Sequence, residues 1–359
     1  MPTQFSRVAV LLAAFASPLS LAQDKPAIAP PPASQPTPQP NPTAEAPAPR
    51  ITDKLKRDAA ALLPIVSTDL ARGFLGATSL LSEPAPRVVY RNRDLGLAVP
   101  ERVYRTMTPE EQATLTPRAC PPQFYYETGY GSPLVYVRLL DLAAPRFSRK
   151  DHPRLLDFGY GSIGQLHLLA HLGFHARGVD VEPMLEALYS EPSDTGSIGE
   201  GLAKVYTGQW PAEPTLRHVI GGQYDLITSK NTLKAGYIHP TPPEGQTVDS
   251  RKLVHLGVSD AMFLEYVHDA LRPGGLFVIY NICPPQNPPD KEYIPWADGK
   301  SPWSREEYEA EGFEVIAFDV EDQAWVLECF DKLGYTGGKP REETAKDYFC
   351  WYTILKRKD

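Results

Sequence analysis

The sequence predicts an α/β fold built on a mostly parallel sheet, and three observations support this prediction. From residue 154 onward, short apolar runs typical of buried strands alternate with amphipathic runs typical of helices. The first strand-like run, residues 154–158, leads into a glycine-rich turn and a helical run at residues 165–173. Two more strand-like runs, residues 313–322 and 347–357, close the chain. Such alternation predicts βα units with helices packed on a mostly parallel sheet.

The first 22 residues have the pattern of a secretory signal peptide. Arg7 supplies a positive charge, residues 8–21 are apolar, and the small residues Ser20 and Ala22 mark a cleavage site. This run is too short for a membrane span, and no later run is long and apolar enough to form one. We therefore expect a mature chain in the periplasm or outside the cell, without a membrane span.

Composition divides the rest of the chain into three parts. Residues 23–50 are rich in proline and alanine, which predicts a disordered linker. Residues 51–150 are broken by prolines and predict an N-terminal helical or irregular extension, or a lid. Residues 151–359 carry the alternating pattern and form the main domain.

Three helix starts stand out within the extension. A helix is expected at residues 52–63 with Thr52 as its cap, because apolar residues recur there at helical spacing. A second start lies at Thr108, which is followed by proline and two glutamates. A third helix is expected at residues 132–145 with Ser132 as its cap.

The cysteines and histidines do not predict a metal site. Cysteine spacing matches no metal-binding motif, and an even count in an oxidising compartment allows either two disulfides or four buried thiols. The four positions are Cys120, Cys283, Cys329 and Cys350. His167 and His171 lie four residues apart on one helix, but the sequence offers them no third ligand.

The glycine-rich turn is the strongest functional signal. Gly159, Gly161 and Gly164 separate the first strand from the helix that follows, and such a turn lets the backbone approach a ligand closely. Asp157 ends the first strand, and Asp180 ends the second. A carboxylate at the second position can accept two hydrogen bonds from the vicinal hydroxyls of a ribose. The pattern therefore predicts a nucleoside-containing ligand.

Four segments together resemble the successive motifs of the class I S-adenosylmethionine-dependent methyltransferases. They read "LLDFGYGSIG", "GVDVEPML", "YDLITSKNTL" and "LRPGGLFVIYN". The resemblance covers residues 154–358 and implies a Rossmann-like, seven-stranded, mostly parallel sheet with helices on both faces. It also implies that the last strand runs antiparallel and that residues 313–322 and 347–357 form the closing pair.

The resemblance also assigns residues to S-adenosyl-L-methionine as the cofactor. Asp157 would meet the methionine part and Asp180 would hold the ribose. The fourth-strand motif would face the methyl group, which implicates Ser229, Lys230 and Asn231.

The adenine contacts follow the family pattern less closely. The family commonly has an acid after the third strand, where this chain has Gln209 and Trp210. Gln209 could hydrogen-bond adenine and Trp210 could stack on it. The third glycine often stands one position earlier, where this chain has Ile163, and this leaves a nicotinamide-dependent oxidoreductase as a rival interpretation.

The long segment after the fourth strand would receive the methyl acceptor. Lys230, Asn231 and His239 are the candidate catalytic residues there, although methyl transfer from a sulfonium needs alignment more than a strong base. With a formal net charge of −8 and no basic stripe, the chain is not expected to bind nucleic acid. The expected acceptor is a small molecule or a component of the cell envelope. A catalytically inactive, ligand-binding version of the fold remains an alternative.

Overall fold

The computed structural model describes residues 49–129, 131–147 and 151–358. The predicted signal peptide and nearly all of the predicted linker lie outside these residues. No helix in the described part of the chain is long and apolar enough to cross a membrane.

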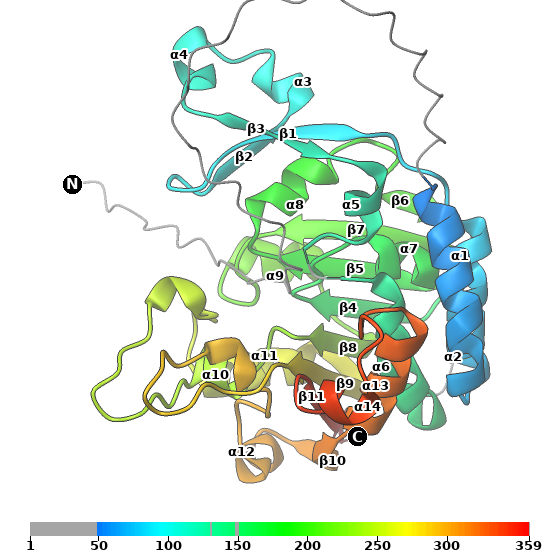
Figure 1. Ribbon diagram of the computed structural model, residues 1–359, viewed down its shortest axis with the longest axis vertical. Helices are drawn as coiled ribbons and strands as arrows, with labels where there is room; N and C mark the ends of the chain where they lie inside the picture. Colours follow the sequence, from blue (N-terminus) through cyan, green and yellow to red (C-terminus); the bar gives the residue numbers. More distant parts are fainter. Residues whose placement is uncertain (1–48, 130, 148–150, 359) are drawn as a thin grey trace, which may run out of the picture.

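An eight-stranded sheet runs through the middle of the molecule (Figure 1). Its order is β10-β11-β9-β8-β4-β5-β7-β6. The strands are β4 (Arg154–Phe158), β5 (His175–Asp180), β6 (Gly196–Ile198), β7 (Gly201–Thr207), β8 (Tyr224–Lys230), β9 (Leu271–Cys283), β10 (Phe313–Glu321) and β11 (Phe349–Arg357). Strands β4, β5, β7, β8 and β9 are mutually parallel, whereas β11 is antiparallel to both of its neighbours.

This topology confirms the predicted α/β, Rossmann-like fold. The antiparallel last strand and its pairing with β10 are as predicted. The sheet has one strand more than the seven predicted, because β6 adds to the edge antiparallel to β7. Strand β6 has three residues and no apolar alternation, so the sequence gives little sign of it.

Helices cover both faces of the sheet, and each face has its own apolar core. One face packs against α6 (Val137–Ala143), α7 (Gly164–His171), α8 (Pro183–Leu188) and α13 (Gln323–Lys332). The other packs against α9 (Pro214–Ile220), α11 (Asp260–Ala270) and α12 (Arg305–Ala310). Short helices α10 (Ala235–Ile238), η5 (Ser250–Lys252), η6 (Pro295–Ala297) and α14 (Arg341–Thr344) lie in the connections.

The N-terminal extension contains a small sheet as well as helices. The helical elements are α1 (Ile51–Leu62), η1 (Leu63–Ile65), α2 (Asp69–Gly76), η2 (Ala77–Leu80), α3 (Glu101–Tyr104), α4 (Pro109–Gln112), α5 (Pro122–Tyr126), η3 (Pro133–Tyr136) and η4 (Ala144–Arg146). Strands β1 (Arg87–Asn92), β2 (Leu97–Pro100) and β3 (Thr116–Cys120) form an antiparallel sheet of order β2-β1-β3, seen at the top of Figure 1. The apolar residues of α1 and α2 join the core of the main sheet.

The predicted helix starts are only partly confirmed. Thr108 caps α4 in a capping box with Glu111, and the Ser132 side chain accepts from the Leu134 N–H. Thr52 does not cap the first helix, because α1 begins one residue earlier, after Arg50. The carboxylate of Glu83 instead accepts the backbone N–H groups of Ile51 and Thr52, at 3.1 Å each.

The four cysteines are buried free thiols. The disulfide alternative is therefore not realised in this structure. Burial raises the pKa of the Cys283 thiol to about 11 and that of Cys329 to about 12, so neither thiol is a reactive nucleophile.

Candidate functional site

The carboxyl ends of β4 and β5 place the two predicted acids at the same edge of the sheet. Parallel pairing brings Phe158 opposite Val179, so the strands end side by side. Beyond β4 the backbone turns through Gly159 and Gly161, both with positive φ (72° and 58°), which favours glycine. The Gly161 N–H points at the Asp180 carboxylate, with 3.2 Å between the nitrogen and Oδ2. The glycine turn is thus tied to the end of the second strand.

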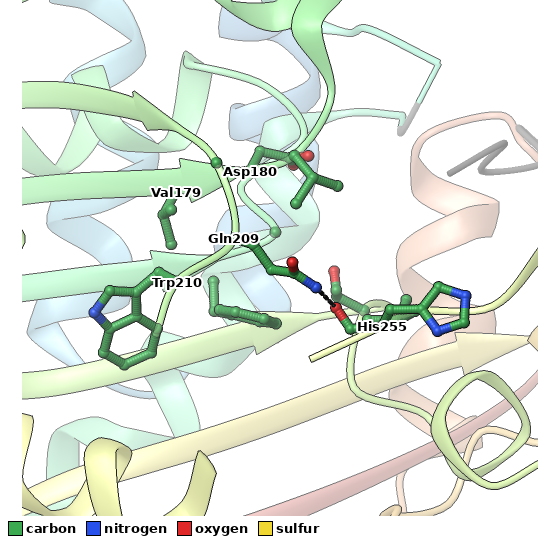
Figure 2. Close-up of a pocket in the computed structure, with 11 residues that line it drawn as sticks. Val179, Asp180, Gln209, Trp210 and His255 are labelled. Atoms are coloured by element: carbon green, nitrogen blue, oxygen red, sulfur yellow. Dashed lines mark hydrogen bonds between the residues drawn. The ribbon is translucent and has the colours of Figure 1, made fainter. Parts of the chain in front are cut away.

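A pocket that is partly open to solvent lies beside this edge. Apolar side chains form most of its wall, and Asp180 and Gln209 add polar groups. Its lining residues are Phe158, Gly159, Val179, Asp180, Val181, Gly208, Gln209, Trp210, Thr232, Val254 and His255. Figure 2 shows Asp180, Gln209 and His255 on the same side of the pocket. An apolar cleft with a few polar groups is the usual form of a small-molecule site.

Asp180 is the acid that lines this pocket. Its carboxylate also accepts the N–H of Glu182, with Oδ1 3.1 Å from that nitrogen. Burial raises the pKa of Asp180 to about 6, although its hydrogen bonds to Glu182 and Gly161 oppose this shift. At neutral pH the carboxylate is therefore mostly ionised and can accept hydrogen bonds from a ligand.

Gln209 and Trp210 both line the pocket, but each already has contacts within the chain. The Gln209 amide donates to the His255 carbonyl at 2.5 Å, as the dashed line in Figure 2 shows. Trp210 points away from that bond and packs against Phe158 and Phe263. Gln209 thus fixes the loop that carries His255, and Trp210 anchors the pocket wall in the core.

Asp157 occupies a different environment, within the buried part of β4. Its carboxylate accepts from Gln165 Nε2 and Thr228 Oγ1, at 3.0 Å each, and is 1% exposed. Thr228 is also hydrogen-bonded to the hydroxyl of Tyr136 in the N-terminal extension. Burial raises the pKa of Asp157 to about 7. Asp157 is thus sealed in a polar cluster and does not line the pocket.

Lys230 and Ser229 lie at the end of β8, and their side chains are placed differently. Burial lowers the pKa of Lys230, whereas the charge of Asp157 opposes this shift, which places the ammonium near the Asp157 cluster. The Ser229 hydroxyl is fully buried and accepts from the Leu233 N–H at 3.3 Å. Neither residue lines the pocket.

Two of the predicted catalytic residues have structural partners. Asn231 adopts a left-handed conformation (φ 64°), and its amide oxygen accepts from the Ile282 N–H at 2.7 Å. His239 pairs with Asp260 at 2.8 Å, and both side chains are well exposed to solvent. Neither lines the pocket, so the structure does not bring the predicted catalytic group together around it.

At two of the glycines, the atoms that approach the backbone closely belong to the chain itself and not to a ligand. A Cβ atom at Gly159 would lie 2.2 Å from the Thr232 hydroxyl oxygen. A Cβ at Gly164 would lie 2.9 Å from Pro133 of the extension and 3.3 Å from the Tyr126 carbonyl. The Gly161 carbonyl accepts from the Thr128 hydroxyl at 2.8 Å. The extension therefore packs directly on the glycine turn.

Sequence reasoning missed several residues at this edge. Thr232, Val254 and His255 come from connecting segments, whose path the sequence pattern does not predict. Lys234, by contrast, lies in the segment in which the methyl acceptor is expected, and the sequence makes it a candidate to position that acceptor. It is buried, and its ammonium donates to the carbonyls of Ile282 and Trp296. Burial lowers its pKa to about 8, and the two hydrogen bonds fix the segment after β8 to the end of β9.

The described residues contain no cluster of three histidine, cysteine or acidic side chains suited to a metal ion. His167, one of the predicted pair, is buried, and its Nε2 lies 2.8 Å from the Asp194 carbonyl oxygen. Burial lowers the pKa of His167 to about 4. This histidine is therefore a neutral core residue.

Comparison with known proteins gives similarity at the level of structure alone. No family model matches the sequence, and no curated protein matches it by sequence. An S-adenosylmethionine-dependent methyltransferase from Thiobacillus denitrificans, solved with S-adenosyl-L-homocysteine, is 15% identical with a TM-score of 0.33. The match covers 61% of this chain and 90% of that one.

Two further solved structures are similar to a comparable degree. A phosphoethanolamine N-methyltransferase from Haemonchus contortus is 12% identical with a TM-score of 0.38, and the match covers 83% of this chain and 76% of that one. The [4+2]-cyclase SpnF is 13% identical with a TM-score of 0.36, covering 62% and 80%. The assignment of the fold therefore rests on the strand order of the sheet itself.

Proposed function

We propose that this chain is an exported, S-adenosylmethionine-dependent methyltransferase that acts on a small molecule or an envelope component. One observation carries the proposal. Asp180, at the end of the second strand, presents a carboxylate to an apolar pocket that begins beside the glycine turn. The signal pattern of residues 1–22 supports export to the periplasm or beyond.

The residues of the pocket fit the adenosine part of this cofactor. Asp180 would accept hydrogen bonds from the ribose hydroxyls, and the apolar wall of Val179, Val181 and Trp210 would bury the base. Bound S-adenosylmethionine supplies an electrophilic methyl group. The chain's own contribution is alignment and exclusion of water by the apolar pocket wall.

A second candidate is a ligand-binding protein without turnover. Asn231 and His239 have structural partners and do not line the pocket. The only lining residues that could act as a general base are then Asp180 and His255, which favours binding without turnover. A nicotinamide-dependent oxidoreductase is a third and weaker candidate, because the glycine spacing alone suggests it.

The test is calorimetric titration of the chain from Gln23 onward with S-adenosylmethionine, S-adenosylhomocysteine and NAD. We expect binding of the first two and not of NAD. Asp180→Asn keeps the size of the side chain but removes the charge, so affinity should fall about 10- to 100-fold, as for loss of a charged hydrogen-bond partner.

Asp225→Asn is the matched control. Asp225 is similarly buried, but it lies near the start of β8, at the edge of the sheet away from the pocket. Its carboxylate accepts hydrogen bonds from the Arg154 backbone N–H and the Arg272 side chain. It should lose stability without losing affinity for the cofactor. Equal affinity in the wild type and Asp180→Asn would refute the ribose assignment, and binding without transfer to any acceptor would favour the second candidate.

A further inference from the structure

Two arginines of the small N-terminal sheet face the main domain. Along β1, Arg87 bonds Asp194 and Val89 is buried, so alternate residues place Arg91 on that same face. Strand β3 pairs antiparallel with β1, and Arg118 lies directly opposite Val89. Side chains opposite each other share a face of the sheet, so Arg91 and Arg118 are neighbours in the space between this sheet and α8.

These two arginines and Arg93, in the turn that follows β1, have no carboxylate partner among the described residues. Arg91 approaches the Met184 sulfur at 3.6 Å, and Arg118 lies over the Phe124 ring at 4.6 Å from its centre. The other arginines of this sheet and of α3 all have acidic partners: Arg87 with Asp194, Arg102 with Glu191 and Arg105 with Glu101.

The positive charges of these three arginines repel one another. Burial, and next the positive charges of Arg118 and Arg93, lower the pKa of Arg91, whereas the carboxylate of Glu182 opposes this shift. The three arginines carry three positive charges, and Glu182 and Asp94, which follows Arg93 in the chain, carry two negative charges, so the net charge is +1. Folding alone gives no reason to collect this charge, since mutual repulsion costs free energy that a bound anion would recover.

The cluster of Arg91, Arg93 and Arg118 lies beside α8, the helix that follows the pocket residues Asp180 and Val181 in the chain. Met184, which Arg91 contacts, belongs to α8, and Glu182 caps that helix directly after the pocket residues Asp180 and Val181. The small N-terminal sheet therefore contacts the helix that directly follows Asp180, the residue that would hold the ribose.

The turn between β1 and β2 also carries a negative charge. Asp94 in this turn lies close enough to Arg251 for its charge to raise the pKa of that guanidinium. Arg251 belongs to η5, which directly precedes the pocket residues Val254 and His255.

We propose that Arg91, Arg93 and Arg118 form a subsite for a phosphomonoester group carried by the acceptor. A phosphomonoester carries about −1.5 to −2 charges at neutral pH, more than a single carboxylate, so it suits a cluster of three guanidinium groups. The planar fork of arginine suits bidentate contact with phosphate oxygens. The inference rests on the proposed function only in giving the bound molecule the role of acceptor.

Binding is measured by calorimetric titration with glycerol 3-phosphate, and with glycerol as the uncharged control, at fixed ionic strength in chloride. We expect saturable binding of glycerol 3-phosphate alone. Arg118→Gln and Arg91→Gln should each weaken it at least tenfold, and Arg91→Lys should weaken it less than Arg91→Gln. Arg105→Gln, an exposed arginine of α3 paired with Glu101, is the control and should change the affinity less than twofold.

The outcomes separate the two proposals. Absence of saturable binding both to glycerol 3-phosphate and to vesicles that contain phosphatidic acid, or equal losses in Arg118→Gln and Arg105→Gln, overturns the subsite. Binding to vesicles that contain phosphatidic acid, but not to glycerol 3-phosphate, supports the subsite and assigns the phosphate to a lipid headgroup. If glycerol 3-phosphate binds and S-adenosylhomocysteine does not, the subsite stands and the methyltransferase proposal fails.

Discussion

Asp157 and Asp180 end neighbouring parallel strands, yet the structure gives them opposite environments. Asp157 lies on the face covered by the N-terminal extension, where Gln165, Thr228 and Tyr136 close a polar cluster around it. Asp180 lines a pocket bounded by the ends of β4 and β5 and by the segments that follow β7 and β8. We refer to these two regions as the covered side and the open side of the sheet edge.

The difference shows that position on a strand does not by itself determine the role of an acid. On the covered side, every strong hydrogen-bonding group near Asp157 belongs to the chain, so the carboxylate holds the extension against the sheet. On the open side, the backbone N–H groups of Gly161 and Glu182 hold Asp180 but leave it at the pocket wall. Only the second arrangement leaves a carboxylate available to a ligand.

The largest expected effect tests how the covered side is held. Asp194 is 1% exposed and accepts from both terminal nitrogens of Arg87 and from the Tyr125 hydroxyl. Asp194→Ala leaves the Arg87 guanidinium partly buried without its partner, which should lower the free energy of unfolding by about 3–5 kcal/mol. Urea denaturation measures this loss.

The control for this variant is Asp290→Ala, an exposed loop aspartate that should change stability by less than about 0.5 kcal/mol. A loss below about 1 kcal/mol in Asp194→Ala would show that the small sheet is attached mainly by its apolar contacts with α8 rather than by this ion pair.

The second prediction separates the two sides by pH. Both acids have a folded pKa (about 7 for Asp157, about 6 for Asp180) above the value of about 3.9 for an unfolded aspartate. The folded state then binds more protons than the unfolded state between pH 4 and 7, so stability falls as pH rises through this range. Urea denaturation at several pH values measures this loss.

Cofactor affinity should have the opposite pH dependence. Ionisation of Asp180 creates the acceptor for the ribose hydroxyls, so affinity for S-adenosylhomocysteine should rise about tenfold through pH 6. Asp180→Asn should flatten this affinity profile, whereas Asp157→Asn should flatten only part of the stability profile. If Asp157→Asn also flattened the affinity profile, the covered side would be part of the ligand site.

The sequence predicts the sheet well because its strands are long, apolar and regularly separated by helices. It predicts the small N-terminal sheet poorly, because β2 and β3 are short, partly exposed and contain prolines. The cap of α1 could not be found locally either, since Glu83 lies more than 30 residues from the N–H groups that it accepts.

The candidate site divides in the same way. Asp180, Gln209 and Trp210 line the pocket as expected, because strand ends and the loops directly after them follow from the sheet topology. Asn231 and His239 do not, because their partners Ile282 and Asp260 belong to distant segments. Residue type and local spacing carry no information about such tertiary partners.

The smallest expected effect concerns the glycine turn, where the two sides meet. Gly164→Ala adds a Cβ 2.9 Å from two Pro133 atoms, so the extension and α7 must move apart slightly. Such overpacking should cost about 1–2 kcal/mol of stability, measured by urea denaturation. Affinity for S-adenosylhomocysteine should remain within twofold of the wild type, because the added methyl group meets the extension rather than a ligand.

Gly76→Ala is the matched control, since Gly76 lies in a helix with φ −62° and no atom near its added Cβ. It should stabilise the protein by about 0.4–1 kcal/mol, because alanine restricts the unfolded chain. Unchanged stability in Gly164→Ala together with a tenfold loss of affinity would reverse the comparison. The covered side would then open in solution, and the glycine turn would face the ligand directly.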